Sequence, residues 1–133
     1  MNRFILASHS KMAEGIAQTV RFFIAESQFD VLEQSVNDIG LEQQASAILT
    51  KYKQDNIVVF TDLYGGSVNQ TFFRLLAGHR FHLITGMNLA LILECVLAQN
   101  DIDETFIKNC LAEAKNQMAY MNDLFRINTD DED

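Results

Sequence analysis

Runs of consecutive apolar residues alternate along this chain with stretches in which apolar residues recur every three or four positions. The runs are typical of strands covered on both faces in a parallel sheet, and the spaced pattern is typical of amphipathic helices. The pattern predicts strands at 4–7, 57–60 and 81–85, and helices at 12–24, 41–52, 67–77, 89–98 and 106–121. Residues 29–36 alternate apolar and polar positions and are predicted as a half-exposed strand at an edge of the sheet. Because strands alternate with helices, we expect an α/β domain with a doubly wound, mainly parallel sheet and helices on both faces.

The C-terminal end is less regular. Residues 125–129 (FRINT) are predicted as a short final strand, and 130–133 (DDED) as an acidic tail. We therefore expect one domain over residues 1–125, followed by a short strand or acidic tail over 126–133. A length of 133 residues suits a single domain.

Composition narrows the function classes. Ten basic and eighteen acidic residues give a net charge of −8, and no basic run or stripe is present. This argues against nucleic acid or an anionic membrane surface as a direct partner. No apolar run reaches the roughly 20 residues of a membrane span, and no signal sequence is recognisable, so we expect a cytoplasmic protein. Cys95 and Cys110 fall on apolar helix faces and are predicted to be buried thiols.

The first candidate for chemistry is His9, which follows the first strand between Ser8 and Ser10. Ligands of open α/β sheets bind at the carboxyl ends of strands, and the next helix begins here with free N–H groups. A neutral imidazole can act as a nucleophile towards phosphorus. A histidine that only fills the turn or caps the helix is the alternative.

A second cluster follows the third strand. Asp62 could accept a hydrogen bond from one ring nitrogen of His9 and leave the other nitrogen free to attack. Gly65 and Gly66 could present backbone N–H groups to an anion, and Ser67 could add a hydroxyl. The alternatives are an Asx-type turn at Asp62 and a flexible turn in which Ser67 and Gln70 form a capping box.

The remaining polar residues are weaker candidates for a functional role. His79 and His82 have a metal-like spacing, but no cysteine or carboxylate cluster accompanies them, so we predict surface or turn histidines and no metal site. Lys11 could assist an incoming phosphate, or it could be a solvated residue at a helix start.

Three motifs together resemble a known family: ASHS with AEG at residues 7–15, VFTDLYGGS at 59–67, and TGMNL at 85–89. The family is the mannose-type enzyme IIA component of the bacterial phosphoenolpyruvate-dependent sugar phosphotransferase system, and the resemblance covers residues 1–125. It implies the sheet order 2-1-3-4 and a homodimer in which a C-terminal strand is exchanged between subunits. Residues 125–129 are the candidate for that strand.

The resemblance also implies a function. His9 would accept a phosphoryl group from the phosphocarrier protein HPr and pass it to a histidine of the IIB component, without metal or cofactor. Asp62 would hydrogen-bond that histidine. Contact with the membrane would be indirect, through the IIC and IID transporter components. The phosphoryl group would be surrounded by the residues flanking the histidine and by the glycine-bearing loop, that is, by Ser8, Ser10, Gly65, Gly66 and Ser67.

Two positions depart from the family pattern. Ser10 stands where most members have glycine, and Val68 where many have proline. The Ser-His-Ser sequence also occurs in the phosphocarrier subunit of phosphoenolpyruvate-dependent dihydroxyacetone kinases, which is one alternative function. A non-catalytic dimeric regulatory module is another. The transported sugar is not encoded in this chain, because specificity lies mainly in the membrane components.

Overall fold

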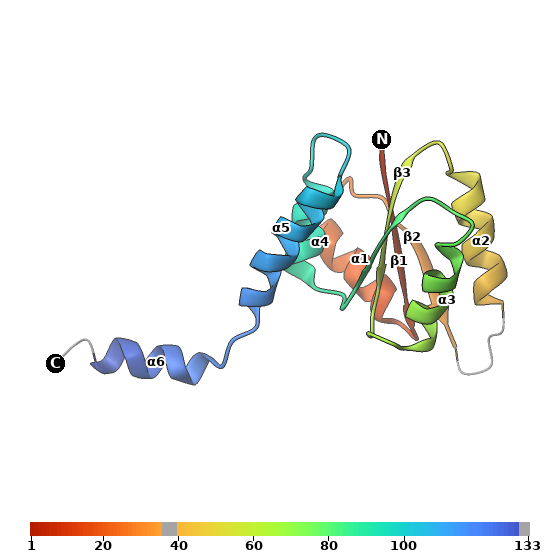
Figure 1. The fold of residues 1–133 in the computed structure, drawn as a ribbon. Helices are drawn as coiled ribbons and strands as arrows, with labels where there is room; N and C mark the ends of the chain where they lie inside the picture. The colour runs from red at the N-terminus through yellow and green to blue at the C-terminus, as the bar shows by residue number, and fades with distance from the viewer. Residues whose placement is uncertain (36–39, 131–133) are drawn as a thin grey trace.

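The computed structural model describes residues 1–35 and 40–130 (Figure 1). The strands are β1 (Asn2–His9), β2 (Asp30–Gln34), β3 (Asn56–Thr61) and β4 (His82–Thr85). The helices are α1 (Met12–Phe23), α2 (Leu41–Lys51), α3 (Ser67–Leu75), α4 (Leu89–Val96), α5 (Glu104–Ala114), the short 3₁₀ helix η1 (Lys115–Gln117) and α6 (Met121–Asp130). Val36, the predicted end of the second strand, lies outside the described residues.

The four strands form one parallel sheet in the order β2-β1-β3-β4, which confirms the predicted fold class and strand order. The first strand is therefore central. In the register of the sheet, His9 stands opposite Gln34 of β2, and Ala7 stands opposite Thr61 of β3. The carboxyl ends of β1, β2 and β3 consequently lie side by side at one edge of the sheet.

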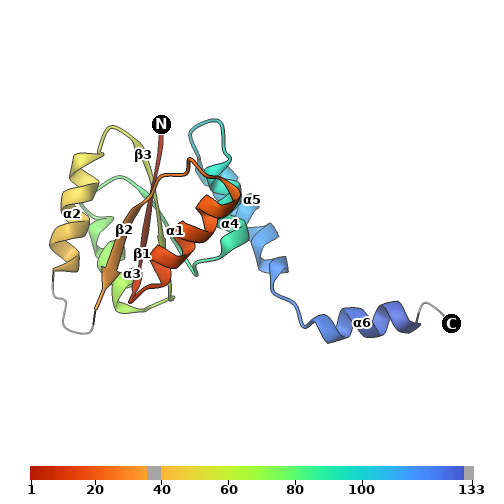
Figure 2. The same cartoon turned by 180° about the vertical axis from the view of Figure 1, so that it is seen from behind.

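Helices cover both faces of this sheet (Figures 1 and 2). Side chains of a strand alternate between faces, so Phe4 and Leu6 of β1 pack in a core with α1, α4 and α5. Ile5 and Ala7 pack in a second core with α2 and α3. Apolar cores thus cover both faces of β1 and β3, which explains why these two strands appear in the sequence as continuous apolar runs.

The segment predicted as a final strand is helical in this structure. Residues 125–129 belong to α6, which stands away from the sheet (Figure 1), and the preceding helix ends at Ala114 rather than near 121. A strand needs a partner for its backbone groups, whereas a helix satisfies them internally. Local contacts support the helix, since Arg126 pairs with Asp123 at 3.0 Å and the Thr129 hydroxyl donates to the Phe125 carbonyl at 2.8 Å. Residues 131–133 of the predicted tail lie outside the described residues.

Candidate functional site

His9 and Asp62 meet at the carboxyl edge of the sheet, as the sequence predicted. Asp62 Oδ2 accepts the backbone N–H of His9 at 2.9 Å and also contacts the ring Nδ1 of His9 at 2.9 Å. Because an ionised carboxylate can only accept hydrogen bonds, Nδ1 carries the proton of this contact. The lone pair of a neutral ring then lies on Nε2, on the opposite side of the imidazole.

The electrostatics of Asp62 favour that ionised state. Partial burial acts to raise the pKa of Asp62, but the hydrogen bonds from the His9 backbone and ring, with the charge of the ring, outweigh it. The net result is a pKa below the ordinary value of 3.8. Just before Asp62, the Thr61 hydroxyl contacts Asn69 of α3 and Thr85 at the end of β4, both at 3.0 Å. These contacts hold the loop that carries the carboxylate.

Ser67 completes the surroundings of the ring. Its Oγ lies 2.9 Å from His9 Nε2 and donates to Gln34 Oε1 at 3.0 Å. The predicted capping box is therefore wrong: Gly66 is the N-cap residue of α3, and the Gln70 side chain donates to the Gly65 carbonyl. The Ser67 hydroxyl faces the imidazole instead of the helix backbone. As the first residue of α3, Ser67 also brings the positive end of the helix dipole towards Nε2.

The two glycines serve the turn in different ways. Gly65 has a φ of 75°, a left-handed conformation that favours glycine. The backbone N–H of Gly66 donates to the Leu63 carbonyl at 3.0 Å, so it is used within the turn. A Cβ at Gly66 would lie 3.2 Å from Cε1 of His9. Gly66 therefore lets the loop approach the imidazole closely.

The serines that flank His9 also differ from each other. Ser8 is fully buried, and its Oγ accepts the backbone N–H of Ala13 at 2.7 Å, which ties β1 to the start of α1. The structure thus places the hydroxyl of Ser8 in a buried contact and leaves Ser10 at the surface. Ser10 has a φ of 53°, and its N–H donates to the Gln34 carbonyl at 2.9 Å. That left-handed backbone explains in physical terms why glycine suits this position.

An open hollow of about 560 Å³ lies beside His9. The side chain of His9 is 42% exposed, so a large partner can reach it. Lys11 lies at the rim and pairs with Glu33 at 3.5 Å, so part of its charge is already balanced. The hollow is lined by His9, Ser10, Lys11, Glu33, Gln34, Ser35 and Ser67.

Sequence reasoning missed Gln34. It treated the second strand only as an edge strand, although Gln34 ends that strand beside β1. The rule that identified His9 and Asp62, namely that polar residues at strand ends share one edge of a parallel sheet, would have found it.

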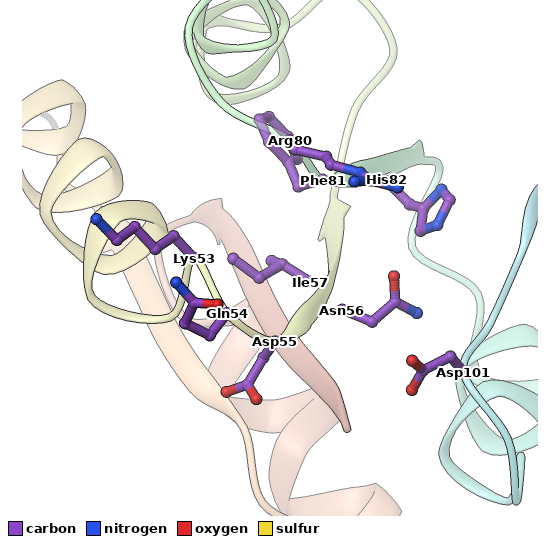
Figure 3. A pocket seen from close by; sticks show the side chains of 9 residues that line it. All are labelled: Lys53, Gln54, Asp55, Asn56, Ile57, Arg80, Phe81, His82 and Asp101. Atoms are coloured by element: carbon purple, nitrogen blue, oxygen red, sulfur yellow. The ribbon is translucent and has the colours of Figure 1, made fainter.

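A second hollow lies at the amino end of the strands (Figure 3). His82 begins β4 in this hollow, which Arg80 and Lys53 also line, whereas His9 ends β1 at the other edge of the sheet. Two acidic side chains of this hollow are already paired, Asp55 with Arg3 and Asp101 with the amino terminus. Among the described residues no cluster of three or more potential metal ligands occurs.

The two cysteines are buried, as predicted. Burial raises the pKa of Cys95 to about 11, with a further contribution from the charge of Glu94. Burial, followed by a hydrogen bond to Glu94, raises the pKa of Cys110 to about 12. Both thiols are therefore protonated at neutral pH and lie outside the His9 site.

Comparison with protein families decides what kind of domain carries this site. The family described as the PTS system fructose IIA component, where PTS is the phosphotransferase system, matches residues 3–114. The chain belongs to this IIA family. The match includes His9 and the residues around it, namely Gln34, Asp62 and Ser67. It agrees with the mannose-type IIA resemblance seen in the sequence. No curated protein matches the chain significantly.

Solved structures give the IIA domain close counterparts. A Klebsiella pneumoniae protein, ascribed to a phosphoenolpyruvate-dependent sugar phosphotransferase system as a permease, is 32% identical, with a TM-score of 0.80 over 93% of both chains. The mannose/sorbose-specific IIA subunit of Enterococcus faecalis is 19% identical, with a TM-score of 0.83 over 90% of this chain and 93% of that one.

A third similar structure is the IIA protein associated with the fucose utilization operon of Streptococcus pneumoniae. It is 20% identical, with a TM-score of 0.80 over 93% of this chain and 96% of that one. These structures share the fold of the IIA domain. Within the described part of the chain, no helix is both long enough and apolar enough to cross a membrane.

Proposed function

We propose that this IIA component carries a phosphoryl group on Nε2 of His9, accepts it from phosphorylated HPr and passes it to a IIB component in sugar uptake. The observation that supports this most is the contact of Asp62 with Nδ1, which favours a proton on that nitrogen and, in a neutral ring, leaves the lone pair on Nε2. Membership of the IIA family supports a phosphocarrier role in a sugar phosphotransferase system.

In the proposed phosphoryl transfer, one P–N bond forms and one P–N bond breaks. The Nε2 lone pair attacks phosphorus, the P–N bond to the histidine of the donor breaks, and its electron pair returns to that nitrogen. The Nδ1 proton stays on His9, held by Asp62, which stabilises the positive charge of the phosphorylated ring. Ser67 and the N-terminus of α3 stabilise the phosphoryl oxygens. The remaining contribution is positioning of two proteins at an open surface.

The test is phosphorylation of the purified chain with phosphoenolpyruvate and the general carrier enzymes. We expect intact-mass measurement to find a gain of one phosphoryl group, which the His9→Ala variant lacks. The His82→Ala variant is the matched control, because His82 lies at the other edge of the sheet and should leave the gain unchanged. Label that persists in His9→Ala and disappears in His82→Ala would overturn the assignment.

The acceptor is tested with the phosphorylated chain. Loss of the phosphoryl group to a mannose-type IIB component, but not to the other subunits of a dihydroxyacetone kinase, is expected. The reverse result would favour the alternative suggested by the Ser-His-Ser sequence. Phosphorylation without transfer to either protein would favour a regulatory module.

A homodimer is part of the proposal. Three apolar side chains of α6, those of Met121, Leu124 and Phe125, are exposed on a helix that stands away from the sheet. Their spacing of three and four residues places them on one helix face, and a second copy of the chain could cover it. We expect sedimentation to find a dimer for the full chain and a monomer after removal of residues 118–133. A full chain that sediments as a monomer at every concentration would contradict this.

A further inference from the structure

Beside the candidate nucleophile, three side chains from different segments form a continuous row. His9 Nε2 lies 2.9 Å from Ser67 Oγ, and Ser67 Oγ lies 3.0 Å from Gln34 Oε1. Gln34 ends β2, His9 ends β1 and Ser67 begins α3. We propose that Gln34 is a positioning residue whose amide sets the direction of the Ser67 hydroxyl proton; this inference rests on the function proposed for His9.

The single hydroxyl proton of Ser67 explains why the side chain of Gln34 matters beside it. The Ser67 hydroxyl has one hydrogen, and in the structure it points to Gln34 Oε1. The oxygen that faces His9 can then only accept, which favours a ring that carries a proton on Nε2. Such a ring has no lone pair with which to attack phosphorus.

The other orientation suits transfer. A glutamine amide carries a donor and an acceptor at the same end, and rotation by half a turn exchanges them. When the Gln34 N–H points to Ser67 Oγ, the hydroxyl proton is released towards Nε2 or, during transfer, towards a phosphoryl oxygen. The amide thus matches the Ser67 hydroxyl to either protonation state of the ring.

The backbone keeps Gln34 at this place independently of its side chain. Gln34 pairs with His9 in the β1–β2 ladder, and its carbonyl accepts the N–H of Ser10 at 2.9 Å. Substitutions of the Gln34 side chain should therefore leave the strand pairing intact and act on the row itself.

The first test observes the His9 ring without any phosphoryl transfer. ¹⁵N spectra at pH 7 report the fraction of rings that carry a proton on Nε2. We expect this fraction to rise in Gln34→Glu, whose carboxylate only accepts, and to fall in Gln34→Leu, which releases the Ser67 proton. In a Ser67→Ala background, Gln34→Leu should produce no change, and the remaining effect of Gln34→Glu measures its charge alone.

The second test is the rate of phosphoryl transfer from phosphorylated HPr. Gln34→Leu should slow it about threefold to tenfold, because Ser67 Oγ loses the Gln34 N–H that would donate to it while its own proton faces the phosphoryl group; this is the effect of one lost neutral hydrogen bond. In the Ser67→Ala background the same substitution should cause no further loss. Gln43→Leu, an identical change at an exposed position of α2, is the control and should retain the native rate.

The outcomes separate this inference from the proposed function. If the native chain gains no phosphoryl group, the proposed function fails. The ¹⁵N spectra of the His9 ring would still test whether Gln34 sets the direction of the Ser67 proton. If the native chain is phosphorylated but Gln34→Leu is as fast as native, the inference fails alone. The inference would also fail if Gln34→Leu slowed transfer equally with and without the Ser67 hydroxyl. It would fail as well if the fraction of His9 rings with a proton on Nε2 changed in the same direction in Gln34→Glu and Gln34→Leu.

Discussion

Gly66→Ala is the substitution for which the structure gives the sharpest expectation. The added methyl carbon would lie 3.2 Å from Cε1 of His9 and 3.2 Å from the Leu63 carbonyl oxygen. The backbone at Gly66, with φ −71° and ψ 167°, suits alanine, so backbone strain does not contribute. Because the carbonyl belongs to a hydrogen-bonded turn, the imidazole is the group that must move.

The size of the effect follows from these distances. Ordinary contacts of a Cβ begin near 3.4 Å, so the ring must shift by about 0.2 Å. That shift loosens contacts that are now 2.9 Å long on both sides of the ring. Since a misplacement of about 1 Å costs about a hundredfold in rate, we expect transfer to His9 to slow about 2.5-fold. The poorer N-cap should lower the unfolding free energy by about 0.5–1 kcal/mol.

The assay is rapid-quench phosphorylation by phosphorylated HPr, with urea unfolding measured on the same samples. Gly15→Ala is the matched control, because a Cβ at Gly15 in α1 meets nothing within 4 Å. It should retain the native rate and raise the unfolding free energy by about 1 kcal/mol. A native rate for Gly66→Ala, with unshifted His9 ring signals, would refute the steric reasoning.

Three further results are expected. Asp62→Asn should lower the unfolding free energy at pH 7 by about 2 kcal/mol. Because the pKa of Asp62 is lowered in the fold, urea titrations should find this difference complete well above pH 4 and lost as the pH falls through the lowered pKa. A difference in unfolding free energy that grows on acidification would contradict this. Ser10→Gly should raise the unfolding free energy by about 0.5–1 kcal/mol by relieving the left-handed backbone, and lower stability in thermal unfolding would count against that account. Cys95 and Cys110, whose pKa values are raised by burial to about 11 and about 12, should react with a thiol reagent at pH 8 only after denaturation, and rapid labelling of the native chain would show that they are accessible.

The central part of the molecule could be predicted because its local and tertiary signals agree. The apolar runs around Ile5 and Val59 identify strands covered on both faces, and a parallel sheet then aligns their carboxyl ends. This alignment brings His9 and Asp62 together because β1 and β3 are neighbours in the sheet. The strand order, by contrast, came from the family resemblance and not from the periodicity.

The errors arose where local sequence patterns compete with tertiary contacts. Ser67 and Gln70 have the spacing of a capping box, but the hydroxyl of Ser67 is taken by His9 and Gln34. Residues 125–129 have strand-like composition, yet the sheet offers them no partner within the described chain, and they form part of α6. Neither outcome could be read from a window of a few residues.

The candidate site joins residues that are far apart along the chain, 53 positions from His9 to Asp62 and 58 from His9 to Ser67. No local segment can therefore assemble it, and a collapsed intermediate with separate helices would lack the arrangement of His9, Asp62 and Ser67. A slip of one residue between β1 and its neighbours would turn the imidazole to the opposite face of the sheet. Under the proposed function, competence for phosphorylation would therefore report on the correct register of three strands, which makes it a sensitive measure of complete folding in any variant of this chain.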